Sequence, residues 1–259
     1  MVSTMKIGLF FIILTWVWTL TPVCAKALDW DPDSIKIVTS DYPPFNYLED
    51  KKPTGLCTRI VQAILKDMKI NVPIITLPWA RAYKMAVKHE NTLIYTIART
   101  KEREHLFHWV GVLVTGNSYL FSMKNRHIRF RSLDQAHPYR IGATLSDIRA
   151  EFLKSKGVLN LDLVVNARMN ALKLLNQRID LWAEDEVAAV YTVRQLGYDP
   201  DEILAKAFPL EISPTPKGYL AFGRNTNPAV VKAFQSALKK FLQTSEYKEI
   251  KSLYTHESE

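Results

Sequence analysis

The stretch IKIVTSDYPPFNYLEDKKPTG, residues 35–55, decides the fold of this chain. Its first five residues, Ile35 to Thr39, are rich in β-branched side chains, which is typical of a buried strand. The sequence Asp41-Tyr42-Pro43-Pro44 follows, and its paired prolines exclude a helix and fix an extended loop. The stretch therefore predicts a strand that ends in a loop carrying Tyr42.

Beyond this loop, the chain alternates between the helical and the strand pattern. Apolar residues recur at helical spacing at Ile60, Ile64 and Met68, which predicts a helix. Further strands are predicted at residues 72–77, 93–97, 139–143, 161–165, 181–183 and 219–222, with a strand-rich segment at 110–122. Further helices are predicted from residue 148, at 169–175, 187–196 and 228–244, and finally to about residue 254. Such alternation indicates parallel sheets of the α/β class.

The β/α pattern runs twice along the chain. The second run is enclosed by strand-rich segments near residues 115–122 and 217–222. We therefore expect two lobes and a chain that crosses between them twice. Residues 28–117 and 218–259 are assigned to the first lobe, and residues 118–217 to the second.

The N-terminus has the layout of a secretory signal peptide. Lys6 precedes an apolar run of 14 residues, from Ile7 to Leu20, and small-residue cleavage sites follow. The run is shorter than the about 20 residues of a membrane-spanning helix, which disfavours a membrane anchor. A lipid anchor on Cys24 is a second alternative, but Val23 stands where lipoprotein processing expects a small residue. We expect cleavage after Ala27, with Ala25 as the competing site, and a periplasmic protein.

Charge and cysteine content exclude several classes of function. Loss of Lys6 and Lys26 with the leader lowers the formal net charge from +8 to +6. The remaining basic residues are scattered without a basic repeat, so no nucleic-acid partner is expected. The mature chain keeps one cysteine, Cys57, which cannot form an internal disulfide. No histidine stands at the spacing of metal ligands, and we expect neither a metal nor a cofactor.

A set of motifs in a fixed order resembles one family of proteins. Asp41-Tyr42-Pro43-Pro44-Phe45 is followed by Gly55 at the entry of a helix and by Pro78-Trp79-Ala80-Arg81. Thr100-Lys101-Glu102-Arg103, Tyr139-Arg140-Ile141-Gly142-Ala143, and Arg178-Ile179-Asp180 with Asp185 five residues later complete the set. In this order the motifs resemble family 3 extracellular solute-binding proteins, the polar amino-acid receptors of ABC importers. The resemblance covers essentially the whole mature chain.

The resemblance implies a type II periplasmic-binding fold with two lobes and two crossover strands. It also implies a monomer that captures a small ligand, such as an amino acid or a related zwitterion, in the cleft between the lobes. The partner is then an ABC transporter permease or a membrane sensor, and the protein is not an enzyme.

The resemblance also assigns the residues that bind the ligand. Arg103 resembles the family arginine that grips a ligand carboxylate, since a guanidinium fork meets both oxygens at once. Asp185 stands where the family places an acid for the α-amino group. It is alternatively a helix cap, and the two roles are compatible. Glu184, beside it, either binds a second amine or faces solvent.

Aromatic and capping residues complete the predicted site. Tyr42 resembles the family's stacking aromatic, whereas Trp79 is either a second cleft wall or a core residue. Ser146 and Asp147 cap a helix of the second lobe, whose free N–H groups suit a carboxylate, although an ordinary cap without a ligand fits equally. Ala98 replaces the serine or threonine of many amino-acid receptors, so only its backbone is expected to contact the ligand.

An enzyme on the same scaffold is the alternative function, because some dehydratases resemble this family. General acid–base catalysis would then use His89, His108 or Glu184. None of the three stands in a recognisable catalytic motif.

Overall fold

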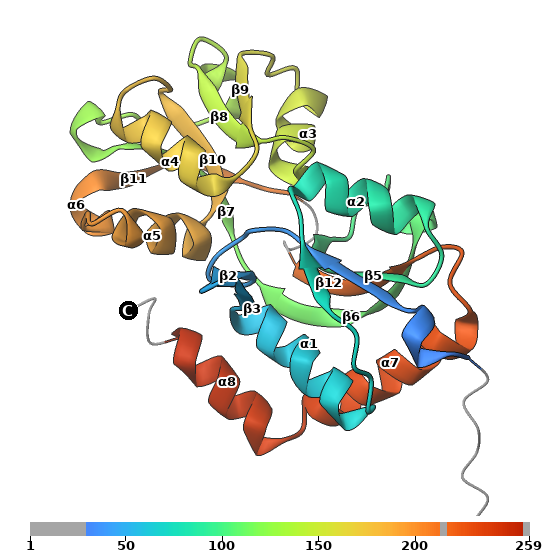
Figure 1. The fold of residues 1–259 in the computed structure, drawn as a ribbon. Helices are drawn as coiled ribbons and strands as arrows, with labels where there is room; N and C mark the ends of the chain where they lie inside the picture. The colour runs from blue at the N-terminus through green and yellow to red at the C-terminus, as the bar shows by residue number, and fades with distance from the viewer. Residues whose placement is uncertain (1–29, 213–216, 256–259) are drawn as a thin grey trace, which may run out of the picture.

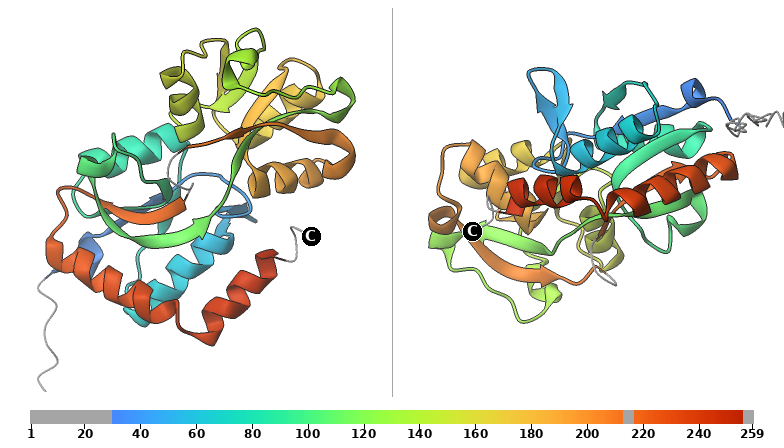
Figure 2. Two further views of the ribbon diagram at one scale, coloured as in Figure 1. Left: turned by 180° about the vertical axis from the view of Figure 1, so that it is seen from behind. Right: turned by 90° about the horizontal axis from the view of Figure 1, so that it is seen from below.

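The computed structural model of the chain describes residues 30–212 and 217–255, which form two α/β lobes (Figures 1 and 2). The predicted signal peptide, residues 1–27, lies outside the described residues. The α/β class and the two-lobe architecture are confirmed.

The first lobe is built on a five-stranded sheet in the order β4-β1-β5-β12-β6. These strands are β1 (Lys36–Thr39), β4 (Ile74–Thr76), β5 (Thr92–Ala98), β6 (Phe107–Thr115) and β12 (Lys217–Gly223). Strand β1 is parallel to β4 and β5, whereas β12 is antiparallel to β5 and β6. The helices of this lobe are α1 (Leu56–Asp67), α2 (Trp79–Lys88), α7 (Pro228–Phe241) and α8 (Ser245–Thr255).

The second lobe carries another five-stranded sheet, in the order β11-β7-β10-β8-β9. Its strands are β7 (Ser118–Met123), β8 (Ile141–Thr144), β9 (Leu161–Val164), β10 (Leu181–Asp185) and β11 (Leu204–Leu210). Its helices are α3 (Ile148–Ser155), α4 (Ala167–Leu175), α5 (Glu186–Gln195) and the short α6 (Pro200–Ile203).

Each sheet is covered on both faces, which explains why its inner strands, such as β5 and β10, are buried along most of their length. In the first lobe, α1 and α7 pack on one face through Ile60 and Phe234, and α2 packs on the other through Ala82. In the second lobe, α3 covers one face through Leu153, and α4 and α5 cover the other with residues such as Val193.

Two connections join the lobes. The chain passes from β6 to β7 through Gly116 and Asn117, and it returns between β11 and β12, after Leu210 and before Lys217. The segment 110–122, predicted as strand-rich, is therefore two strands that belong to different sheets. The precise division of the chain at residues 117 and 217 stays a prediction.

The structure adds elements that the sequence patterns did not predict. A short hairpin, β2 (Tyr47–Glu49) and β3 (Lys52–Thr54), occupies the segment expected to be a loop. Strand β11 forms the edge of the second sheet, and β10 is two residues longer than predicted, because Glu184 and Asp185 pair with Tyr119 and Ser118 of β7. This extension carries both acids into the region between the lobes.

Candidate functional site

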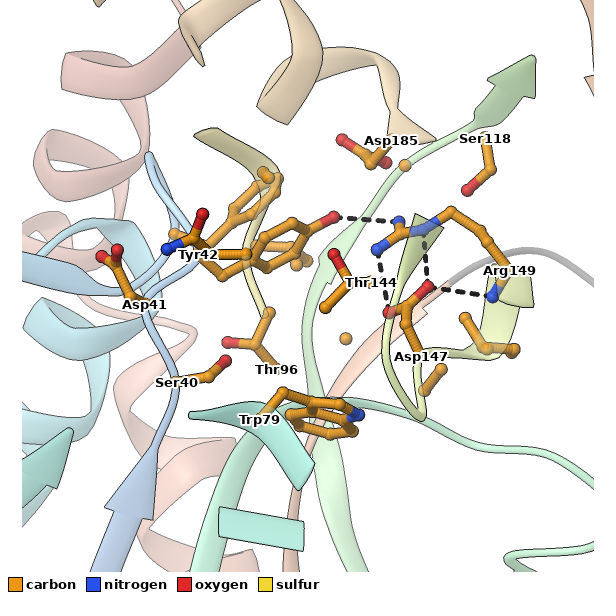
Figure 3. Close-up of a pocket in the computed structure, with 18 of the residues that line it drawn as sticks. Ser40, Asp41, Tyr42, Trp79, Thr96, Ser118, Thr144, Asp147, Arg149 and Asp185 are labelled. Atoms are coloured by element: carbon orange, nitrogen blue, oxygen red, sulfur yellow. Dashed lines mark hydrogen bonds and ion pairs between the residues drawn. The ribbon is translucent and has the colours of Figure 1, made fainter. Parts of the chain in front are cut away.

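A cavity of about 90 Å³ lies between the two lobes (Figure 3). Its lining comes from both sheets. The first lobe contributes Tyr42, Trp79, Ala98 and Arg103, and the second contributes Thr144, Asp147, Arg149 and Asp185. Six of the seven site residues predicted from the sequence therefore line one cavity. The seventh, Ser146, lies beside it and contacts two of the six.

The loop after β1 positions Tyr42. The Asn46 side chain donates a hydrogen bond of 2.7 Å to the carbonyl oxygen of Ser40, and the Tyr42 N–H donates to the carbonyl oxygen of Asn46. The loop rests on the start of α1, where Gly55 has a φ of 104° and approaches Phe45 closely. A Cβ atom on Gly55 would lie 2.6 Å from the Phe45 carbonyl oxygen, so glycine is required here.

Tyr42 connects the lobes through its hydroxyl group. The hydroxyl accepts a hydrogen bond of 3.0 Å from Nη1 of Arg149 and donates one of 3.3 Å to Oε1 of Glu184. The Arg149 guanidinium also lies 5.5 Å from the centre of the tyrosine ring. Burial raises the pKa of Tyr42 well above its ordinary value, so the phenol stays protonated and can act as this donor.

Arg103 is buried, with 2% of its side chain exposed, and it too reaches across the cleft. Its Nη2 atom lies 2.8 Å from Oε2 of Glu151 and 3.3 Å from the Ser146 carbonyl oxygen, both in the second lobe. Its Nη1 donates to the carbonyl oxygen of Ala98 at 3.5 Å. The guanidinium carbon lies 5.0 Å from the centre of the Tyr83 ring, within the range of a cation–π contact.

Trp79 and Ser146 form a second contact between the lobes. The indole Nε1 of Trp79 donates a hydrogen bond of 2.7 Å to the Ser146 carbonyl oxygen. Ser146 has a φ of 60°, which belongs to the left-handed region. Ser146 thus contributes its carbonyl group to these contacts, and the cap of α3 is Asp147, whose Oδ1 accepts from the Arg149 N–H at 2.9 Å.

Arg149 is the buried cation of the second lobe. Its Nε and Nη2 donate to the two oxygens of Asp147 at 2.7 and 2.9 Å (Figure 3). Nη2 also lies 3.0 Å from Oε1 of Glu184. A planar guanidinium meets a carboxylate in this two-bond arrangement with good geometry. Together with the bond to Tyr42, these contacts engage most of its N–H groups.

Asp185 and Glu184 are buried acids at the end of β10. Oδ1 of Asp185 accepts hydrogen bonds from the N–H groups of Val187 and Ala188, so this residue caps α5. Burial, partly opposed by the charge of Arg149, raises the pKa of Asp185 to about 6 and that of Glu184 to about 7. A nearby cation therefore stabilises the ionised form of both acids.

Three residues of the site were not assigned to it from the sequence. Arg149 and Glu151 belong to α3, where arginine and glutamate are common on exposed faces. Glu184 was predicted either to bind a second amine or to face solvent, and the structure buries it against Tyr42 and Arg149. A local signal existed for Arg149, because Asp147 stands two residues before it at the helix cap. No sequence signal indicated that Glu151 would meet Arg103.

The residues proposed for acid–base catalysis do not converge. His89 follows the end of α2, and His108 lies in β6, where its Nε2 is 2.8 Å from the carbonyl oxygen of Arg224. Neither histidine is among the residues that line the cavity in the described part of the chain. Glu184 is thus the one member of the trio that contacts the cleft residues.

The described residues contain neither a cluster of metal ligands nor a membrane-spanning helix. Within them, no group of three or more potential ligands stands close enough to hold a metal ion. In residues 30–212 and 217–255, no helix combines the length and the apolar character needed to cross a bilayer.

The chain matches the model of a protein family over residues 35–257. It belongs to the bacterial extracellular solute-binding proteins, family 3. The resemblance of the sequence motifs is thereby confirmed. A comparison with curated proteins found no match.

Solved structures share the fold of this family 3 chain at low sequence identity. One is the sensor domain of a histidine kinase with similarity to periplasmic binding proteins, with a TM-score of 0.75 and 15% identity, covering 85% of this chain and 95% of the other. A mutant of ArgBP from T. maritima has a TM-score of 0.74 and 13% identity, and the match covers 86% of this chain and 96% of the other. A third is AbpA from Streptococcus pneumoniae, an amino acid ABC transporter substrate-binding protein bound to L-arginine. Its TM-score is 0.72 at 17% identity, and the match covers 87% of this chain and 97% of the other.

Proposed function

We propose that this protein is a periplasmic receptor that captures a small amine-bearing ligand, an amino acid or a related zwitterion, between its lobes. Membership of family 3 supports a solute-binding role outside the cytoplasm. The finer assignment depends on one observation: Arg103 and Asp185, buried side chains of opposite charge from different lobes, line the same cavity.

The two charges define how the ligand is oriented in the cleft. The guanidinium of Arg103 suits the carboxylate end of the ligand, and the Asp185 carboxylate suits the ammonium end. Because the two groups belong to different lobes, only a closed protein holds both ends of one ligand. Tyr42 and Trp79 form the aromatic walls of this site, and Asp147 and the backbone of Ala98 complete its lining.

The captured ligand is delivered to an ABC transporter or to a membrane sensor. Both destinations have support in the comparisons, since similar folds include an ABC transporter substrate-binding protein and a histidine kinase sensor domain. A binding role without catalysis agrees with the placement of His89 and His108 away from the cavity.

A thermal-shift screen tests the proposal. Purified protein is heated with each of the amino acids, simple amines and short organic acids in turn. A compound that binds the native state raises the unfolding temperature, and the shift grows with the logarithm of its concentration divided by its dissociation constant. We expect the largest shift from a compound with an ammonium group, called the screen ligand below. A shift by organic acids alone would contradict the proposal.

A further inference from the structure

Both guanidinium groups of the cleft are already paired with carboxylates of the protein. Arg103 is held by Glu151 at 2.8 Å, and Arg149 is held by Asp147 through two hydrogen bonds. Nη2 of Arg103 donates to both Glu151 and Ser146, so both of its hydrogens are engaged. A ligand carboxylate that approaches the guanidinium fork through Nη2 therefore competes with Glu151.

The remaining charge of the cleft is negative. The cations that line the cavity are Arg103, Arg149 and Lys217. The carboxylates that line the cavity or pair with these cations are Asp41, Asp147, Glu151, Glu184 and Asp185. Among the described residues, five acids thus face three cations when all are ionised, and all of these acids except Asp41 belong to the second lobe.

One of these acids has a free oxygen at the cavity. Asp185 is 5% exposed, and its Oδ1 accepts two hydrogen bonds from the start of α5. Its Oδ2 has no hydrogen-bond partner among the described residues, although the side chain lines the cavity (Figure 3). A buried carboxylate oxygen without a donor is costly, and a ligand N–H group relieves that cost.

We propose that Glu151 is a specificity-determining residue, which neutralises Arg103 so that the cleft prefers an amine of net positive charge over a neutral zwitterion of the same shape. This proposal rests on the proposed function and names the charge class of its ligand. Glu151 is suited to the role because 49% of its side chain is exposed, so it can swing away from Arg103 at a cost, whereas Glu184 is fixed in the core.

Amino acids and their amides provide matched probes. L-alanine and L-alaninamide have nearly the same shape, but the amide lacks the carboxylate and carries a net positive charge; L-arginine and L-argininamide form a second, longer pair. Isothermal titration calorimetry near neutral pH gives the ratio of the two dissociation constants in each pair. The proteins to compare are wild type, Glu151→Gln and the control Asp67→Asn. Asp67 pairs with Lys240 on the first lobe and is also 49% exposed.

We expect wild type to bind the amide of at least one pair about tenfold more tightly than the acid. Glu151→Gln frees Arg103, so the free amino acid of each pair should bind more tightly. The ratio of the two dissociation constants should then shrink by about tenfold, while Asp67→Asn leaves that ratio unchanged. Tighter binding of both acids in wild type, or a ratio that Glu151→Gln does not change, overturns this inference but leaves the proposed function standing. Absence of binding of all four probes, and of every amine-bearing compound in the thermal-shift screen, overturns both.

Discussion

The Asp185 carboxylate lies directly against the backbone of Gly116. A Cβ atom on Gly116 would stand 2.1 Å from Asp185 Oδ2, far inside the contact distance of real atoms. Gly116 lies where the chain crosses from β6 to β7, and Asp185 ends β10, the neighbour of β7. The connection between the lobes therefore shapes the acidic end of the cavity.

Gly116→Ala should displace the Asp185 carboxylate and weaken ligand binding. Because the new methyl group and Oδ2 cannot occupy the same space, we expect the affinity for the screen ligand to fall by about tenfold or more, or 1.4 kcal/mol. Calorimetry measures the affinity, and thermal unfolding shows whether the variant is folded. An unchanged dissociation constant in a folded variant would separate Asp185 from the binding site.

Arg103→Ala should lower the affinity for an amino acid by roughly 2–5 kcal/mol, because its carboxylate loses the guanidinium partner, whereas an amide that lacks the carboxylate should lose less. Arg103→Lys keeps the charge but loses the planar fork, so its affinity should lie between wild type and alanine. The control is Arg126→Ala, because Arg126 pairs with Asp180 in the second lobe, away from the cavity. Equal effects of Arg103→Ala and Arg126→Ala on the dissociation constant would refute the role of Arg103.

The family resemblance named most of the residues that line the cavity, and their role in binding stays a prediction. The loop after β1 and the helix start after Asp147 also follow from local strand–loop–helix order. The partners of Arg103 and Arg149 were not predictable in the same way. Glu151 meets Arg103 only because the two lobes face each other, and a single sequence contains no periodicity that reports contacts between lobes.

Strand β10 illustrates the same limit within one element. Its apolar residues predicted a strand at 181–183, and the acids that follow broke the pattern. Pairing with β7 extends the strand through Glu184 and Asp185, so tertiary hydrogen bonds override the weak strand preference of acidic residues. The consequence is that two carboxylates are buried between the lobes.

Glu184→Gln should stabilise the protein at neutral pH. Burial raises the pKa of Glu184 from 4.5 to about 7, so the folded protein binds more protons than the unfolded chain between these values. The free energy of unfolding therefore falls as the pH rises through this range, and the variant avoids that loss. Above pH 7 we expect a gain on the order of 2–3 kcal/mol, which disappears near pH 4.5.

Chemical denaturation at several pH values measures this effect. Glu104→Gln is the control, because Glu104 pairs with Arg99 on the surface of the first lobe, and it should leave stability nearly unchanged at every pH. A variant at position 184 that is less stable than wild type at every pH would mean that its hydrogen bonds to Tyr42 and Arg149 outweigh the cost of its charge.

Ligand binding should show the opposite pH dependence. The pKa of Asp185 is about 6, so the carboxylate is protonated in more acidic solution and loses its attraction for an ammonium group. We expect the affinity for the screen ligand to fall as the pH decreases through 6, and Asp185→Asn to bind weakly at every pH. Calorimetry over this range, with wild type and variant side by side, is decisive, because equal pH profiles of the two proteins would exclude Asp185 as the titrating group.

Cys57 offers a chemical probe of the loop that carries Tyr42. Its side chain is fully buried in α1, and burial raises the pKa of the thiol to about 12, so almost none of it is the reactive thiolate. The Cys57 N–H donates a hydrogen bond of 2.8 Å to the Phe45 carbonyl oxygen, which ties α1 to the Tyr42 loop. Alkylation of Cys57 must therefore wait until this part of the first lobe opens.

Iodoacetamide labelling, followed at Cys57 by peptide mass spectrometry, should be slow in the native protein and fast in denaturant. Saturation with the screen ligand should slow it further, because a ligand held against Tyr42 stabilises the closed loop by mass action. Cys57 is the one cysteine after the predicted leader, so the modified peptide identifies the site of labelling. Native labelling at the denatured rate would show that α1 does not protect the thiol, and an unchanged rate with ligand would place the bound molecule away from Tyr42.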